Sequence, residues 1–107
     1  MRFEALELAL VIISHLRKLL PAIRRQDAKL HNQLKDAGSS ISLNLGEGNR
    51  RRGKDRIFLW TVASGSAEEI RTGLRSAVAW GYVTRGAVGR VEGKLDRVRR
   101  LLWGLQR

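Results

Sequence analysis

The sequence contains no cysteine, only one proline and few aromatic residues. Without cysteine the chain has no disulfide, no cysteine-based zinc site and no thiol nucleophile, which agrees with a reducing cytoplasm. A chain of 107 residues can bury a core without such cross-links, so we expect one domain over residues 1–107. The single proline and the scarcity of alternating apolar stretches argue against a β-sheet.

The sequence also has no apolar run long enough to cross a membrane. The run at residues 5–13 is interrupted by Glu7, and Arg17 and Lys18 end it well before membrane-spanning length. No small-residue cleavage site follows it, so it does not look like a secretory signal. We therefore expect a buried helix, a cytoplasmic protein and no membrane partner.

Acidic residues are scarce compared with basic ones. The chain has 21 Lys and Arg against 10 Asp and Glu, which gives a formal net charge of +11. Such a surplus repels itself in a compact fold, and a polyanionic partner would relieve that repulsion. The excess of arginine suits phosphate recognition, because the planar guanidinium matches phosphate oxygens. The alternative is a solvated basic surface that only keeps the protein soluble.

The apolar periodicity predicts four helices, at about residues 3–20, 22–45, 54–80 and a last one containing 88–105. We expect Pro21 to separate the first two helices, because its ring disfavours a helical residue before it. Short connections make successive helices antiparallel neighbours. The predicted fold is therefore all-α, an antiparallel up-down-up-down four-helix bundle.

The same periodicity predicts which side chains form the core. On the first helix we place Phe3, Leu6, Leu10, Ile13 and Leu20 on one apolar face. Its other apolar residues widen that face beyond what a monomeric bundle can cover, which predicts self-association. Ile57 and Phe58 are core candidates at the start of the third helix. The residues that we expect to be mostly buried are Leu30, Leu34, Ile41, Ile57, Val62, Leu74, Val91, Leu95, Val98 and Leu102.

No pattern in the sequence predicts an active site. Residues 48–55 nearly match the phosphate-binding loop G-x-x-x-x-G-K-[ST], but Asp55 stands where a hydroxyl must reach magnesium, and a helix precedes the loop instead of a strand. Neither His15 nor His31 has the Glu three residues earlier that di-metal bundles use. No nucleophile elbow is present. We expect no enzymatic activity, no cofactor and no metal.

Two groups of basic residues are candidates for contact with phosphates. The first lies in the loop before the third helix, where the positive end of the helix dipole would add attraction for an anion. It consists of Arg50, Arg51, Arg52, Lys54 and Arg56. The second lies away from the apolar seam of the fourth helix and consists of Arg90, Lys94, Arg97 and Arg100. The alternative for the loop is a solvated turn whose cations serve solubility.

Polar residues inside the second and third helices have a structural interpretation. If these helices fold back about a loop near Arg51, Gly65 and Ser66 lie roughly opposite residues 35–37, where small side chains permit close approach. Glu69 would then lie near Gln33, which could satisfy a partly buried carboxylate. By the same argument, Asn44 and Glu47 could fasten the end of the second helix to the start of the third.

These polar residues also carry a family resemblance. A Ser-Ile-x-x-Asn-Leu-x-Glu-Gly segment, an arginine-rich loop and a Gly-Ser-x-x-Glu-Ile segment follow one another. The matching positions are Ser40, Ile41, Asn44, Leu45, Glu47, Gly48, Gly65, Ser66, Glu69 and Ile70. The pattern resembles the four-helix-bundle proteins encoded within ribosomal RNA intervening sequences, which are related to the accessory variability proteins of diversity-generating retroelements. Ser42 and Gly46 depart from it, since the family usually has proline and alanine there.

The resemblance implies a ring-like homopentamer with a basic surface and no enzymatic activity. For retroelement relatives it also implies partnership with a reverse transcriptase and its RNA or DNA template. Together with the charge, it predicts a nucleic-acid-binding accessory protein that contacts RNA or DNA phosphates without sequence preference. The alternative is a protein-binding oligomeric scaffold that makes no direct contact with nucleic acid.

Overall fold

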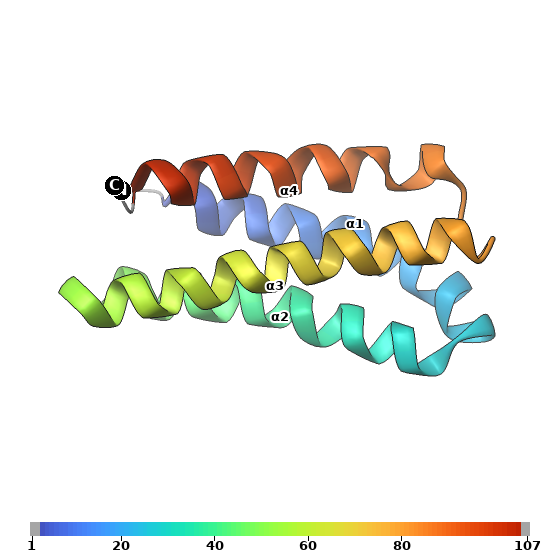
Figure 1. Cartoon of the computed structure of the whole chain (residues 1–107), viewed down its shortest axis with the longest axis horizontal. Helices are drawn as coiled ribbons and strands as arrows, with labels where there is room; N and C mark the ends of the chain where they lie inside the picture. The colour runs from blue at the N-terminus through green and yellow to red at the C-terminus, as the bar shows by residue number, and fades with distance from the viewer. Residues whose placement is uncertain (1–2, 106–107) are drawn as a thin grey trace.

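A computed structural model of the chain describes residues 3–105, which form four α-helices (Figure 1). The helices are α1 (Glu4–Gln26), α2 (Ala28–Asn49), α3 (Gly53–Ala79) and α4 (Arg85–Leu105). They lie side by side along a body of 42 × 22 × 21 Å. The predicted all-α class is confirmed.

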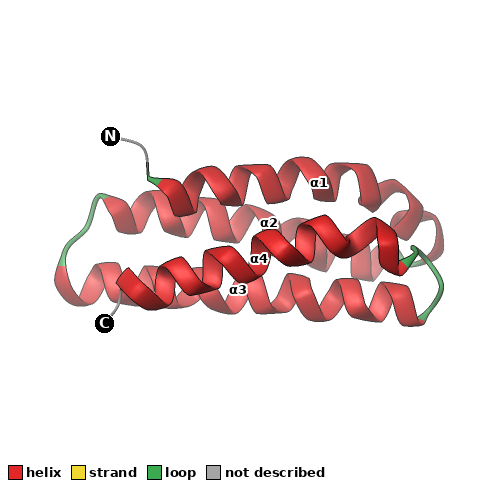
Figure 2. Cartoon of the chain, turned by 90° about the horizontal axis from the view of Figure 1, so that it is seen from above, coloured by secondary structure: helices red, strands yellow, loops and turns green. Residues whose placement is uncertain are grey.

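The helices follow one another around the bundle. α1 packs against α2 and α4, and α3 packs against the same two helices. Successive helices run in opposite directions, as Figures 1 and 2 show, so the up-down-up-down arrangement is also confirmed. One end of the bundle therefore holds the start of α1, the α2–α3 loop and the end of α4. The other end holds the α1–α2 and α3–α4 connections.

The core consists of apolar residues and includes most of the predicted seam. Among the described residues no polar or charged residue is buried. The α4 residues at alternating spacings of three and four fall on one helical face, which explains why all of them are buried up to Leu102. The predicted core residues that are buried are Leu34, Ile41, Leu74, Val91, Leu95, Val98 and Leu102.

The prediction that Pro21 separates two helices is wrong. α1 continues through Pro21 to Gln26, and the break falls at Asp27, whose backbone has φ −156° and ψ 89°. Pro21 lies on the exposed side of α1, where losing one helical hydrogen bond leaves the carbonyl accessible to water. Asp27 instead caps α2, because its Oδ1 accepts a hydrogen bond of 2.9 Å from the Leu30 amide.

The buried face of α1 also differs from the predicted one. Leu10 is 46% exposed, whereas Ala5 and Ala9 are almost completely buried. The core line of the helix is Ala5, Ala9, Ile12, Leu16, Leu19 and Ile23. Small side chains at the start of this line allow α1 to approach its neighbours closely, so the larger residues are displaced to its edges. Phe3, Leu6, Ile13 and Leu20 are accordingly half-buried.

At the start of α3 the structure contradicts two further predictions. Ile57 and Phe58 are 50% and 66% exposed, and the buried residue of this turn is Trp60. The first turns of α3 extend past the end of α4 in Figure 1, so α4 does not cover them. The predicted core residues Leu30 and Val62 are half-buried at the edge of the core.

Candidate nucleic-acid interface

The first basic group lies where α2 ends and α3 begins. Arg50 closes α2, with its amide bonded to the carbonyl oxygens of Glu47 and Gly48. Gly53 then begins α3 with φ 59°, a left-handed conformation that a residue with a side chain rarely adopts. The connection is therefore short and held at both ends, which places all of the loop's basic side chains at one end of the bundle.

Glu47 neutralises part of this group. Its carboxylate lies 2.8 Å from Arg51 and 3.8 Å from Arg50. The hydrogen bond and charge of Arg51 lower the pKa of the Glu47 carboxyl, and the same contact raises the pKa of Arg51. Arg52 and Lys54 are exposed and form no ion pair with any described residue. An anion could therefore contact these two cations of the loop without displacing an acidic partner.

Arg56 has a structural role that the sequence did not indicate. Its Nε and Nη2 donate hydrogen bonds of 3.0 Å to the carbonyl oxygens of Gly48 and Asn49 at the end of α2. The guanidinium also lies over the Trp60 ring, 5.2 Å from its centroid. The Trp60 ring in turn stacks on the ring of Phe3, with 5.4 Å between the two ring centroids. Arg56 therefore fastens α3 to the end of α2. The other four predicted residues of this group do not make this contact.

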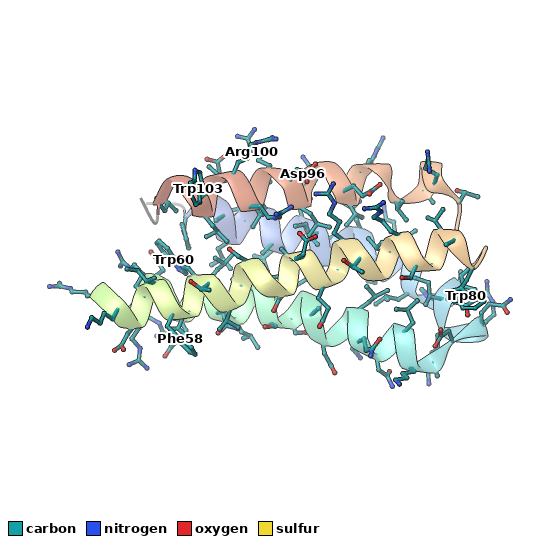
Figure 3. The ribbon with its side chains drawn as sticks, in the orientation of Figure 1. Phe58, Trp60, Trp80, Asp96, Arg100 and Trp103 are labelled. Atoms are coloured by element: carbon teal, nitrogen blue, oxygen red, sulfur yellow. The ribbon has the colours of Figure 1, made fainter. Side chains whose placement is uncertain are left out.

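The second basic group is spread along α4. Arg97 pairs with Glu4 of α1, which offsets its charge. Arg100 lies on the outer side of α4 near Asp96 and Trp103, with which it lines a pocket of about 500 Å³ (Figure 3). Arg90 and Lys94 form no ion pair with a described residue.

The polar motif residues make structural contacts, although not all of the expected ones. Ser66 of α3 donates a hydrogen bond of 2.8 Å to Ser40 of α2, about one turn from the predicted position opposite residues 35–37. Asn44 bonds to the backbone carbonyl and the hydroxyl of Ser40, within its own helix. The predicted link from Asn44 and Glu47 to α3 is therefore wrong, and Arg56 supplies it instead.

Gly65 and Glu69 line a surface groove between α2 and α3. Gln33 lines the same groove, as predicted, and the volume of the groove is about 430 Å³. Glu69 is exposed, so its carboxylate stays in water and needs no buried partner. A side chain at Gly65 would meet no atom within 4 Å, and close helix approach therefore does not explain this glycine.

A third basic group lies between α1 and α2 and was not predicted. We call it the α1–α2 groove; it has a volume of about 620 Å³. Its lining residues are Arg17, Leu20, Pro21, Arg24, Arg25, His31 and Lys35. The sequence signal was the seven-residue spacing of Arg17 and Arg24 and the four-residue spacing of His31 and Lys35. That signal was obscured by the expectation that one helix ends at Pro21.

Within residues 3–105, no group of three or more His, Asp or Glu side chains is placed to hold a metal ion. None of the helices in this described part is both long enough and apolar enough to cross a bilayer.

Comparison with known proteins places the chain in a family. A sequence model of the 23S rRNA-intervening sequence protein family matches residues 2–104. A solved structure from Bacteroides thetaiotaomicron, of a protein with unknown function from the S23 ribosomal protein family, aligns with a TM-score of 0.87. The alignment covers 96% of this chain and 98% of that chain at 18% identity, so this likeness shows the fold alone. No curated protein matches the chain.

Proposed function

The chain belongs to the family of 23S rRNA-intervening sequence proteins, and from this premise we propose that it is a non-enzymatic accessory protein that binds nucleic acid through phosphate groups. Binding is independent of base sequence, because basic side chains contact the phosphates of the backbone, which carry no sequence information. RNA is the first candidate ligand, given the family.

The observation that carries the proposal is the positive charge that the fold leaves without an acidic partner among the described residues. The chain has a formal net charge of +11. Ion pairs between described residues engage only Arg50, Arg51, Arg71, Arg97 and Arg99. The remaining cations repel one another in the folded state, and a polyanion would lower that repulsion while releasing its own counterions.

The proposal includes a homopentamer, in which each basic surface is repeated around the assembly. Repetition would let weak contacts on single subunits combine through effective concentration. It also includes a reverse transcriptase as a candidate protein partner, with the shared RNA or DNA template as the link between the two.

Fluorescence anisotropy with labelled probes would test direct binding. The probes are two single-stranded RNAs of unrelated sequence, a single-stranded DNA and a DNA duplex. We expect similar affinities for the two RNAs and a linear fall of log K with log salt concentration. Arg52→Ala with Lys54→Ala should weaken binding of both RNAs equally and flatten the salt slope, by about 0.7 for each phosphate of the single strand that the protein no longer neutralises.

Absence of binding to all four probes at low salt would reject the proposal. The exposed apolar residues would then favour the alternative, a scaffold that binds other proteins. A strong preference for one RNA sequence would reject the claim of sequence independence while leaving nucleic-acid binding intact.

A further inference from the structure

We propose that the α1–α2 groove is the principal site for the nucleic-acid backbone and that it holds successive phosphates of one single strand. The inference rests on the proposed function and adds to it a location and a ligand form. Neither of the basic groups predicted from the sequence includes any residue of this groove.

The first argument is the charge inside the groove. Four of its lining residues are Arg17, Arg24, Arg25 and Lys35, and no acidic residue is among the others. None of the four forms an ion pair with a described residue. The loop group differs, because Glu47 holds two of its arginines and backbone carbonyls hold a third. The groove therefore has more cations without an acidic partner among the described residues than either of the other two basic groups.

The second argument is the shape of the groove. Cations come from both walls, from α1 on one side and α2 on the other, so a strand lying between them is contacted from two directions. Adjacent packed helices have axes about 8–10 Å apart, so the groove between them is too narrow for a duplex to enter. The whole bundle is only 22 × 21 Å across, so a duplex would rest on a face without entering the groove.

The third argument is the spacing of the cations along the two helices. Arg17 and Arg24 are seven residues apart, or about 10 Å at a rise of 1.5 Å per residue. On the opposite wall Lys35 is the cation, and the ring of His31 lies four residues, or about 6 Å, from it. Charges spread over this length match several phosphates of a strand better than one isolated anion.

Leu20 and Pro21 complete the wall without adding hydrogen-bond donors. They can lie against sugars, whereas no Phe, Tyr or Trp lines the groove as a stacking platform for bases. The groove thus recognises a backbone and not a base sequence. An anionic membrane is disfavoured as its occupant, because a flat bilayer cannot follow a concave surface between two helices.

The test compares two variants of the full chain from which the same charge is removed. The groove variant carries Arg17→Gln, Arg24→Gln and Lys35→Gln. The control variant carries Lys29→Gln, Arg75→Gln and Arg85→Gln. These three cations lie at the same end of the bundle as the groove, are exposed and form no ion pair with a described residue. Circular dichroism should show equal helix content in both, since all six residues are exposed.

We expect the groove variant to bind single-stranded RNA about tenfold or more weakly at moderate salt. Its salt slope should fall by about two units, since each neutralised phosphate of a single strand accounts for roughly 0.7 of the slope. The affinity of the control variant for the same RNA should fall by less than about threefold, because long-range charge is screened over about 10 Å at 0.1 M salt. In the wild type, a single strand should bind more tightly than a duplex of the same length.

Other outcomes separate the two proposals. Equal weakening in the two variants would overturn the groove as the site and leave nucleic-acid binding standing. A preference for duplex over single strand would overturn the ligand form. If the wild type bound no nucleic acid, the proposed function would fail, and the groove proposal with it. Groove-dependent binding to phosphatidylglycerol vesicles alone would then identify a lipid surface as the occupant.

Discussion

Gly48 shows how one residue of the family motif acts through packing. The indole of Trp60 lies directly on its Cα, and a Cβ built there would come within 2.6 Å of the ring atoms Cδ1 and Nε1. The ring cannot retreat easily, because Phe3 stacks on it and Arg56 lies over it. Gly48 is therefore required for the contact between α2 and α3, and its carbonyl is one of the two that Arg56 binds.

Two glycines of the same helix should consequently respond to alanine in opposite ways. We expect Gly48→Ala to lower the free energy of unfolding by about 1–3 kcal/mol, the usual cost of overpacking a core. Gly46→Ala should raise it by about 0.5–1 kcal/mol, because alanine is the better helix former and no atom lies within 4 Å of the new methyl group. Urea unfolding followed by circular dichroism measures both changes. A shift in the same direction for both variants would contradict this account of the motif glycine.

At the scale of the helices, Asp27 is the residue at which α1 ends and α2 begins. It caps α2 through Oδ1, and its Oδ2 accepts a hydrogen bond of 3.3 Å from the hydroxyl of Tyr82 in the α3–α4 connection. One side chain thus joins both connections at this end of the bundle. Pro21, the expected breaker, lies inside α1 instead.

Replacing Asp27 should separate its capping role from its charge. We expect Asp27→Ala to lower the free energy of unfolding by about 1 kcal/mol, since alanine cannot accept the Leu30 amide. Asp27→Asn should retain nearly all of the stability at neutral pH, because asparagine caps as well as aspartate does. Thermal unfolding would measure both variants. Equal destabilisation in the two would indicate that the charge, not the cap, is what matters.

The ionisation of Tyr82 gives a second measurement of the same joint. Burial raises the pKa of its hydroxyl, and the charge and hydrogen bond of Asp27 raise it further. A raised pKa contributes stability that is fully present below the ordinary tyrosine range, about pH 10, and is lost as the pH rises through the shifted value. Tyr82 is the only tyrosine, so phenolate absorbance reports on it alone. We expect its titration midpoint to fall in Asp27→Asn, and an unchanged midpoint would contradict the contact.

Helix by helix, the sequence predicted best where a single interpretation was possible. α4 has one apolar line among polar residues, so its face was predicted correctly through Leu102. α1 is apolar around much of its circumference, and choosing its largest residues missed Ala5 and Ala9. Its extension past Pro21 was missed because the break was placed at the proline, although Asp27 is a local N-cap signal for α2, three residues before the Leu30 amide that it binds. The α1–α2 groove could not be predicted for the same reason, because it forms only when residues 17–25 belong to one helix that packs beside α2.

At the scale of the whole molecule, the exposed apolar residues are unevenly distributed. Most of them lie in the half of the bundle that contains the α2–α3 loop. Among residues 3–105 this group consists of Leu10, Val11, Leu43, Ile57, Phe58, Trp103 and Leu105, and Trp80 is the only large apolar residue exposed at the other end. Figure 3 shows Phe58 and Trp80 far apart along the long axis. A concentration of this kind indicates a surface that another protein subunit covers, and the proposed homopentamer supplies that subunit.

Self-association through this half should be sensitive to Phe58 and insensitive to Trp80. Both are largely exposed in the single chain, at 66% and 72%, so serine at either position should leave the bundle folded. We expect light scattering to give the mass of five 12.1 kDa chains for the wild type and for Trp80→Ser, and a smaller particle for Phe58→Ser. Phe58→Ser should also bind RNA more weakly with a shallower salt slope, although it removes no charge, because fewer basic surfaces then act together.

A monomeric wild type would reject self-association, and a dimer or tetramer would reject only the pentamer. If Phe58→Ser dissociated the particle without weakening RNA binding, each subunit would be binding alone, and the argument from effective concentration would fail.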